Sequence, residues 1–220
     1  MNRDEYFARW AVLHGGYDPR EGGRIVRWWL TMVHAIAKPF VALRVPPDAI
    51  TVLGGLLAAG VVAVASLGGR WVLLAVVVVA LSGIVDNLDG AVAVMTSRTT
   101  RWGYVLDSVV DRVADVLYVV ALLAVGAPGW VCALGATLMF LQEYARARAA
   151  AGGMSEVGVV TVWERPTRVI VTAMFLLGAG IYVDHAVGWA TAGAAAWATL
   201  GVLGCVQLLV VVRRKLSVEG

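Results

Sequence analysis

Four aspartates lie within sequence that is otherwise apolar enough to form membrane-spanning helices. They are Asp86, Asp89, Asp107 and Asp111, in the stretch DNLDGAVAVMTSRTTRWGYVLDSVVD. A charged carboxylate near the centre of a bilayer costs at least about 2.5–3.5 kcal/mol, so four of them must face one another and share compensating positive charge. The spacing allows this, because residues separated by three or four positions lie on one face of a helix.

The rest of the chain supports a membrane setting. It has 220 residues, of which 60% are hydrophobic, and a mean hydropathy of +0.80, whereas soluble domains are about 45–50% apolar. Apolar runs near or above 18 residues recur, which predicts an all-α integral membrane protein with six transmembrane helices. The predicted spans are 50–67, 71–95, 102–125, 130–150, 169–187 and 189–212. No segment has the basic, aromatic-interleaved pattern of a nucleic-acid binder, so nucleic acid is not an expected partner.

An amphipathic segment precedes the first span. Polar residues recur every three or four positions from Arg24 to Lys38, and the other face carries residues such as Ile25, Trp28 and Trp29. This pattern predicts an interfacial helix lying on the cytoplasmic side of the bilayer, although a helix packed on a soluble core is an alternative. We therefore divide the chain into a polar N-terminal segment (1–23), a juxtamembrane helix (24–45) and a six-helix domain (46–215).

The positive charges predict an orientation. Every Lys and Arg except Arg70 and Arg112 falls in residues 1–49, 96–101, 146–168 or 213–220. Cytoplasmic loops carry the excess of Lys and Arg, so we expect a multi-pass protein of the cell membrane with both termini in the cytoplasm.

The acidic stretch also suggests a ligand. Hard carboxylate oxygens suit Mg²⁺ or Mn²⁺, and no His or Cys lies nearby in the sequence to favour zinc. Two cations in such a site can neutralise and orient a phosphate group. The alternative is a carboxylate cluster that relays protons or pairs with Arg112.

The stretch 86–111 resembles the signature of the CDP-alcohol phosphatidyltransferases. The residues that fall on it at the family's spacing are Asp86, Asp89, Gly90, Ala93, Gly103, Asp107 and Asp111. The resemblance implies transfer of a phosphatidyl group from CDP-diacylglycerol to an alcohol, with release of CMP. It also implies that the four aspartates hold two metal ions, that Asp111 is the base, that Gly90 and Gly103 leave room for the nucleotide, and that the protein is a homodimer.

Two further positions near this stretch are informative. The segment PPDAIT resembles the family's entry to the first span, which would place Thr51 near the nucleotide phosphates, although a simple helix-entry role explains Thr51 equally well. Val94 stands where the family has an arginine. We expect Arg98, one helical turn further on and on the same face, to supply part of the missing positive charge.

The segments EYARARA and ERPTR resemble those of actinobacterial phosphatidylinositol-phosphate synthases. The resemblance implies that Arg146 and Arg168 bind the phosphate of the acceptor, while a solvated surface cluster is the alternative. Leu208 stands where that subfamily has a third basic residue, so inositol phosphate, glycerol phosphate, phosphatidylglycerol and an unphosphorylated alcohol all stay open as acceptors. We expect Glu143 to pair with the nearby arginines and Asp115 to support Arg112 or the acidic site.

Two other functions stay open. A small transporter would use the intramembrane acids, although such proteins are usually built from two matching halves with broken helices, which the sequence lacks. A catalytically silent family paralogue, acting as a membrane partner, would explain Val94 and Leu208. Finally, Ala190, Ala194 and Ala198 form a row of small residues that permits close helix packing, within the chain or in a dimer.

Overall fold

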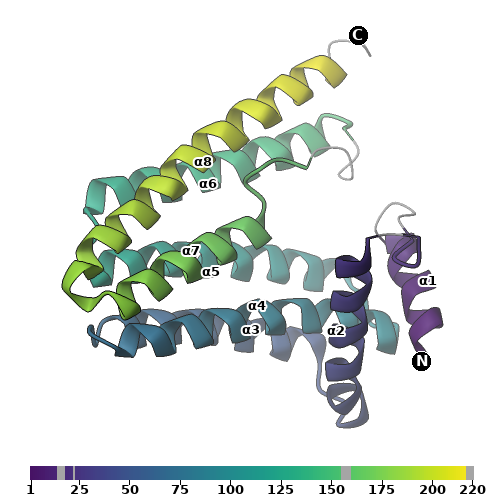
Figure 1. Ribbon diagram of the computed structural model, residues 1–220. Coiled ribbons are helices and arrows are strands. Elements are labelled where there is room, and N and C mark those ends of the chain that lie inside the picture. The colour runs from purple at the N-terminus through teal and green to yellow at the C-terminus, as the bar shows by residue number, and fades with distance from the viewer. Residues whose placement is uncertain (14–17, 22, 155–159, 217–220) are drawn as a thin grey trace. The chain divides into compact units, whose positions relative to one another are not determined.

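The computed structural model describes residues 1–13, 18–21, 23–154 and 160–216; parts of the predicted N-terminal segment (14–17 and 22) lie outside this range. In the described ranges the chain forms α-helices and one short 3-10 helix, and no strand (Figure 1). The all-α prediction is therefore confirmed. The elements are α1 (Arg3–Leu13), α2 (Arg24–Ala42), α3 (Pro47–Ala65), α4 (Trp71–Thr96), α5 (Arg101–Val125), α6 (Gly129–Ala151), α7 (Arg165–Ile181), η2 (Val183–His185) and α8 (Ala186–Leu216).

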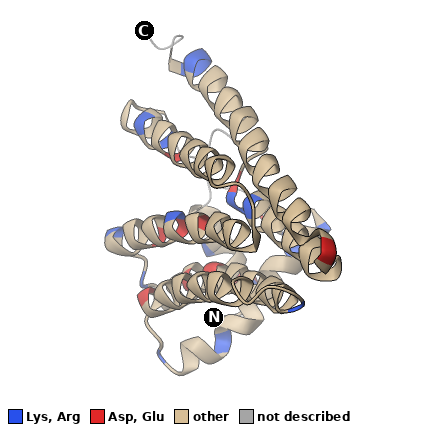
Figure 2. Cartoon of the chain, turned by 90° about the vertical axis from the view of Figure 1, so that its left-hand side faces the viewer, with Lys and Arg blue, Asp and Glu red and all other residues tan. Residues whose placement is uncertain are grey.

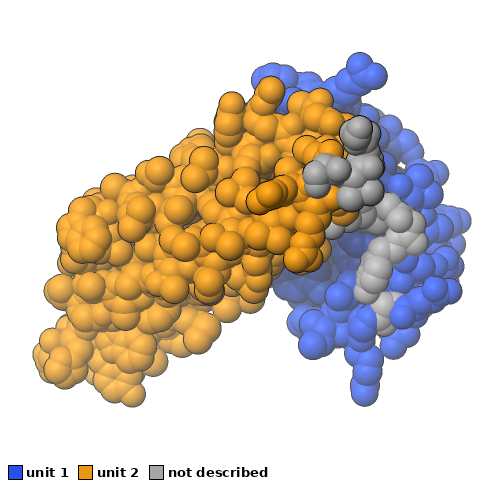
Figure 3. Space-filling view, turned by 90° about the horizontal axis from the view of Figure 1, so that it is seen from above, with its two compact units in different colours: residues 1–56, 81–111 blue, residues 57–80, 112–220 orange. Residues whose placement is uncertain are grey.

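The helices divide between two compact units, coloured separately in Figure 3. Unit 1 comprises Met1–Leu56 and Leu81–Asp111, and unit 2 comprises Leu57–Ala80 and Arg112–Gly220. Helices α3, α4 and α5 each contribute one part of their length to each unit. All four aspartates of the acidic stretch belong to unit 1, and the two predicted acceptor arginines belong to unit 2.

Helix α1, in unit 1, was not expected in the polar N-terminal segment. Its first turn is closed by a reciprocal capping box. The Glu5 N–H donates to Asn2 Oδ1 over 2.8 Å, and the Asn2 N–H donates to Glu5 Oε2 over 3.1 Å. Tyr6 and Phe7 are each 1% exposed, and burial raises the pKa of Tyr6 to about 12. Apolar burial together with the cap explains why this polar segment is helical.

Helix α2 corresponds to the predicted juxtamembrane helix, but His34 does not lie on an exposed polar face. Its side chain is buried, and its ring stacks on Tyr6 with the centroids 5.2 Å apart. Ile25 and Trp28 stay exposed, as an interfacial helix requires. Helix α1 therefore packs against part of the face of α2 that the sequence pattern predicted to be exposed to water.

Three helical segments in the described residues are long and apolar enough to cross a membrane: Pro47–Ala65, Trp71–Thr96 and Val183–Leu216. Figure 2 shows long stretches of helix without any charged residue. Of the other predicted spans, α7 has 17 residues, and α5 and α6 carry charged residues along their length. The protein thus has several candidate spans, and the count of six stays a prediction.

In unit 2, α8 packs beside α6 and α7 (Figure 1). The close approach depends on small residues of α8: Ala190, Ala194 and Ala198 are buried within the chain. A Cβ added at Gly204 would lie 2.5 Å from Gln142 Oε1 and 2.6 Å from Trp163 Cβ. The row of small residues predicted from the sequence therefore serves packing inside the chain.

Candidate metal site and arginine cluster

The end of α4 and the start of α5 bring acidic side chains together in unit 1. Helix α4 ends in a Schellman motif, in which the Arg98 N–H donates to the Ala93 carbonyl over 2.9 Å and Ser97 adopts a positive φ of 55°. Only residues 97–100 separate the two helices. This short connection lets the aspartates of α4 face those of α5.

Three of the four predicted metal ligands converge. Asp86, Asp107 and Asp111 are half-buried, and each offers a carboxylate oxygen within 4.8 Å of the others. Three like charges at this separation repel one another strongly, and a divalent cation between them would replace that repulsion with attraction. Oxygen-only ligands of this kind fit Mg²⁺ or Mn²⁺.

Asp89, the fourth predicted ligand, lies outside that group of three. It is 6% exposed, and its Oδ2 accepts a hydrogen bond of 2.6 Å from Thr51 Oγ1. The carboxylates of Asp86 and Asp107 both act on it electrostatically, so it lies close to two of the three acids. The structure thus brings Thr51 to the acidic stretch by a direct contact, although Thr51 also donates to the Pro47 carbonyl as a helix-entry residue would.

The two predicted nucleotide glycines differ in their surroundings. Within the described part of the chain, a Cβ added at Gly90 would meet no atom within 4 Å. At Gly103 the same atom would lie 3.1 Å from Thr100 Oγ1 and 3.6 Å from Asp48 Oδ1. Gly90 therefore has open space beside Asp89, and Gly103 permits a close approach at the start of α5.

The prediction that Arg98 lies on the same helical face as Val94 is wrong. Helix α4 ends at Thr96, so Arg98 lies beyond the helix in the turn and shares no helical face with Val94. Val94 itself is 6% exposed and packs in the apolar core of unit 1, as does its neighbour Val92, while Ala93 is half-buried. A contribution of Arg98 to donor binding stays a prediction, but it must come from the exposed turn.

Another cation does reach the end of α4. Arg9 of α1 donates through Nη1 to Ser97 Oγ over 2.6 Å. Arg9 was not a predicted site residue, because nothing local in the sequence links it to a turn 88 positions away. A positive charge near a helix C-terminus interacts favourably with the negative end of the helix dipole.

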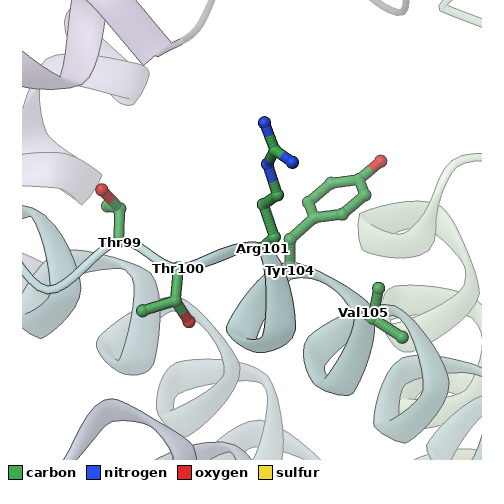
Figure 4. A pocket seen from close by; sticks show the side chains of 5 residues that line it. All are labelled: Thr99, Thr100, Arg101, Tyr104 and Val105. Carbon is green, nitrogen blue, oxygen red and sulfur yellow. The ribbon is translucent and has the colours of Figure 1, made fainter.

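A shallow pocket lies at the turn between α4 and α5 and at the first residues of α5. It is lined by Thr99, Thr100, Arg101, Tyr104 and Val105. Figure 4 shows the side chains of Arg101 and Tyr104 extending on the same side of the helix. None of its lining residues was a predicted site residue.

Unit 2 holds a dense cluster of arginines and acids from α5, α6, α7 and the segment before α7. We call it the arginine cluster: Arg112, Asp115, Glu143, Arg146, Glu164, Arg165 and Arg168. Arg168 is fully buried and donates to Asp115 Oδ2 over 2.7 Å and to Glu143 Oε1 over 2.6 Å. Arg146 donates to Glu164 Oε1 over 2.7 Å.

The cluster confirms two expectations and adds one residue. Glu143 does pair with nearby arginines, and Asp115 lies 3.6 Å from Arg112. Glu164, which the sequence analysis did not single out, binds Arg146 and also accepts from the Thr161 N–H. Arg146 and Arg168 thus belong to one network of ion pairs, in which Arg168 is fully buried and Arg146 is partly buried, and this argues against a solvated surface cluster.

Comparison with known proteins agrees with these features. Residues 44–210 match the family model of the CDP-alcohol phosphatidyltransferases. A phosphatidylinositol phosphate synthase of Mycobacterium marinum is 31% identical over 201 residues, which cover 81% of this chain and 78% of that protein. An archaetidylinositol phosphate synthase of Pyrococcus horikoshii is 27% identical over 160 residues, 71% of this chain and 84% of that protein.

A solved structure extends the likeness to the fold. The crystal structure of Mycobacterium tuberculosis phosphatidylinositol phosphate synthase with CDP-DAG bound has a TM-score of 0.68 and 26% identity, and covers 83% of this chain and 94% of that chain. The same synthase in complex with manganese and citrate gives a TM-score of 0.69 at 25% identity, over 82% of this chain and 88% of that chain. The protein therefore belongs to the CDP-alcohol phosphatidyltransferase family of enzymes.

Proposed function

We propose that this protein transfers a phosphatidyl group from CDP-diacylglycerol to inositol phosphate or a related phosphorylated alcohol, and releases CMP. The observation that carries the proposal is the convergence of Asp86, Asp107 and Asp111 within the family-matched region. The M. tuberculosis relative, solved with CDP-DAG and with manganese, supports the donor and the cation. The synthases among the relatives support the acceptor class.

The acids of unit 1 have distinct proposed roles. Asp86, Asp89, Asp107 and Asp111 would hold two Mg²⁺ or Mn²⁺ ions, which supply positive charge to the diphosphate of the donor. Thr51 holds the Asp89 carboxylate through its 2.6 Å hydrogen bond, and so fixes the direction in which Asp89 points. Gly90, Ala93 and Gly103 would leave space for the nucleotide.

Asp111 would take the proton of the acceptor hydroxyl. The alcohol oxygen then forms a bond to the phosphorus of the phosphatidyl group, and the bond from that phosphorus to the bridging oxygen breaks, so that CMP leaves. Arg146 and Arg168 would bind the acceptor's phosphate, because guanidinium groups form paired hydrogen bonds with phosphate oxygens.

The membrane arrangement is part of the proposal. Six spans with both termini in the cytoplasm agree with the distribution of Lys and Arg, and α2 would lie at the cytoplasmic surface. Homodimerisation stays a prediction from the family resemblance.

The test is release of CMP by purified protein in detergent with Mn²⁺ or Mg²⁺, CDP-diacylglycerol and a panel of phosphorylated and unphosphorylated alcohols. We expect release with a phosphorylated acceptor, loss of release in EDTA, and a loss of at least about 10²-fold in Asp111→Asn, the usual worth of a general base. Asp184→Asn, an exposed acid in η2, is the matched control. CMP release that is insensitive to Asp111→Asn, or absent with every acceptor, would refute the proposal and favour a silent paralogue or a transporter.

A further inference from the structure

The carboxylate of Glu143 lies among three guanidinium groups from three helices. Glu143 Oε1 is 2.6 Å from Arg168 Nη2, and Oε2 is 2.7 Å from Arg112 Nη1 and 3.8 Å from Arg146 Nε. Arginine guanidinium groups form paired hydrogen bonds with two oxygens of a carboxylate or of a phosphate, so the same arginines can bind either anion. Glu143 thus occupies the position in the arginine cluster that suits an anionic ligand.

Arg168 has no free surface on which a second anion could bind. Its side chain is 0% exposed, and its Nη atoms donate to Asp115, Glu143 and the Trp163 carbonyl. Arg168 Nε has no hydrogen-bond partner in the described residues, but it too is buried. An incoming phosphate can therefore reach the Arg168 guanidinium only if one of these partners moves away. The Asp115 side chain is also 0% exposed, whereas that of Glu143 is 20% exposed. Glu143 is thus the acidic partner with a route to solvent.

The net charge of the arginine cluster favours replacement of Glu143 by a phosphate over binding of a phosphate alongside Glu143. The cluster holds four arginines against the three carboxylates of Asp115, Glu143 and Glu164, a net charge of +1. A phosphate dianion added to it would leave a net charge of −1 in a largely buried place, which is costly. If Glu143 moves out, the net charge becomes +2, which a phosphate dianion neutralises.

We propose that Glu143 is a specificity-determining residue that occupies the anion position of the arginine cluster and must leave it before a phosphorylated acceptor can bind. It thereby lowers the affinity of this protein for phosphorylated acceptors and leaves its affinity for uncharged alcohols unchanged. The inference rests on the proposed function for the nature of the acceptor. It does not rest on that function for the exchange itself, which inorganic phosphate can test.

The first test is Glu143→Gln, which removes the charge and keeps the size of the side chain. We expect the KM for inositol phosphate to fall about tenfold or more, the worth of one competing charged hydrogen bond. The KM for CDP-diacylglycerol, the KM for an unphosphorylated alcohol and all parameters of the control Asp184→Asn should stay unchanged. An unchanged or raised KM for inositol phosphate in Glu143→Gln would overturn the proposal, because a purely structural role of Glu143 could lower stability or kcat but not improve acceptor affinity.

The second test uses the wild-type protein and needs neither a variant nor a turnover assay. Crystals grown with inorganic phosphate should show phosphate between Arg146 and Arg168, with the Glu143 carboxylate turned away from both. Glu143 still bound to Arg168, with phosphate elsewhere or absent, would overturn the proposal. Because phosphate binding needs no donor, this experiment tests the exchange even if no acceptor supports CMP release, so failure of the exchange and failure of the proposed function are distinguishable.

Discussion

Replacing Asp107 by Asn should change the thermal stability of the protein in opposite directions with and without a divalent cation. In the absence of metal, the carboxylate oxygens of Asp86, Asp107 and Asp111 lie within 4.8 Å of one another. Two unit charges at 4.8 Å repel by about 0.9 kcal/mol in water and about 3.5 kcal/mol at an effective dielectric constant of about 20. The substitution removes two of the three repulsive pairs, and so relieves about 2–7 kcal/mol at a pH where all three acids are ionised.

The assay is the apparent melting temperature of the detergent-solubilised protein at pH 8, in EDTA and in Mn²⁺. For a chain of this size about 1 kcal/mol corresponds to about 2–4 °C, so Asp107→Asn should melt at least about 4 °C above wild type in EDTA. In Mn²⁺ the wild type should gain stability by binding the ion, and the variant, which lacks one ligand, should gain less. Asp184→Asn controls for loss of one negative charge. A lower melting temperature of Asp107→Asn in EDTA, or an undiminished gain in Mn²⁺, would refute the reasoning.

Three further outcomes are expected. Gly204→Ala should destabilise unit 2 by about 1–3 kcal/mol through overpacking against Trp163. Gly188→Ala is the control and should not destabilise it, because a Cβ added there meets no atom within 4 Å in the described residues. Equal melting temperatures of the two variants would contradict this prediction. Arg168→Met should lower the free energy of unfolding by about 3–5 kcal/mol, because Asp115 and Glu143 each lose their shortest contact to a guanidinium group, 2.7 Å and 2.6 Å. Unfolding curves that overlay those of wild type would argue against the network. Burial lowers the pKa of His34 below its usual 6.5, so the docked α1 binds fewer protons than the undocked state. Docking of α1 is therefore strongest above about pH 6.5 and weakens as the pH falls toward the lowered pKa. Hydrogen exchange of α1, corrected for intrinsic rates, should show this loss in wild type and not in His34→Gln, and equal pH dependence in both would count against it.

The grouping of acids at the candidate metal site could be predicted largely from helical spacing. Asp107 and Asp111 are one turn apart on α5, and a short turn joins α5 to the end of α4, so local geometry alone directs them toward Asp86. The offset of Asp89 could not be predicted, because it depends on a contact with Thr51, 38 positions earlier.

The errors of the sequence analysis have physical causes. Arg98 was predicted to lie on the same helix as Val94 because the residue that ends α4 is a serine. Ser97 adopts a positive φ, a conformation that in a sequence is usually indicated by glycine. Helix α1 was missed although Asn2 and Glu5 have the spacing of a capping box, because the burial that stabilises α1 depends on His34 in another helix. Such non-local contacts leave no periodic pattern in the sequence.

In the arginine cluster, the sequence predicted the partners but not their arrangement. A pairing of Glu143 with Arg146 follows from their spacing of three residues on one helix. The shorter contacts of Glu143, to Arg112 on α5 and Arg168 on α7, arise from tertiary packing. They are the contacts that make Glu143 a competitor for an anionic ligand.

The proposed function depends on a divalent cation held by Asp86, Asp107 and Asp111. The most direct test is anomalous X-ray diffraction from crystals of the wild-type protein grown with Mn²⁺. The account predicts a manganese peak at about 2.0–2.6 Å from oxygens of all three carboxylates, the range of distances for hard cations bound to oxygen. A well-diffracting crystal with no manganese peak there, or with the ion bound to other residues, would contradict it.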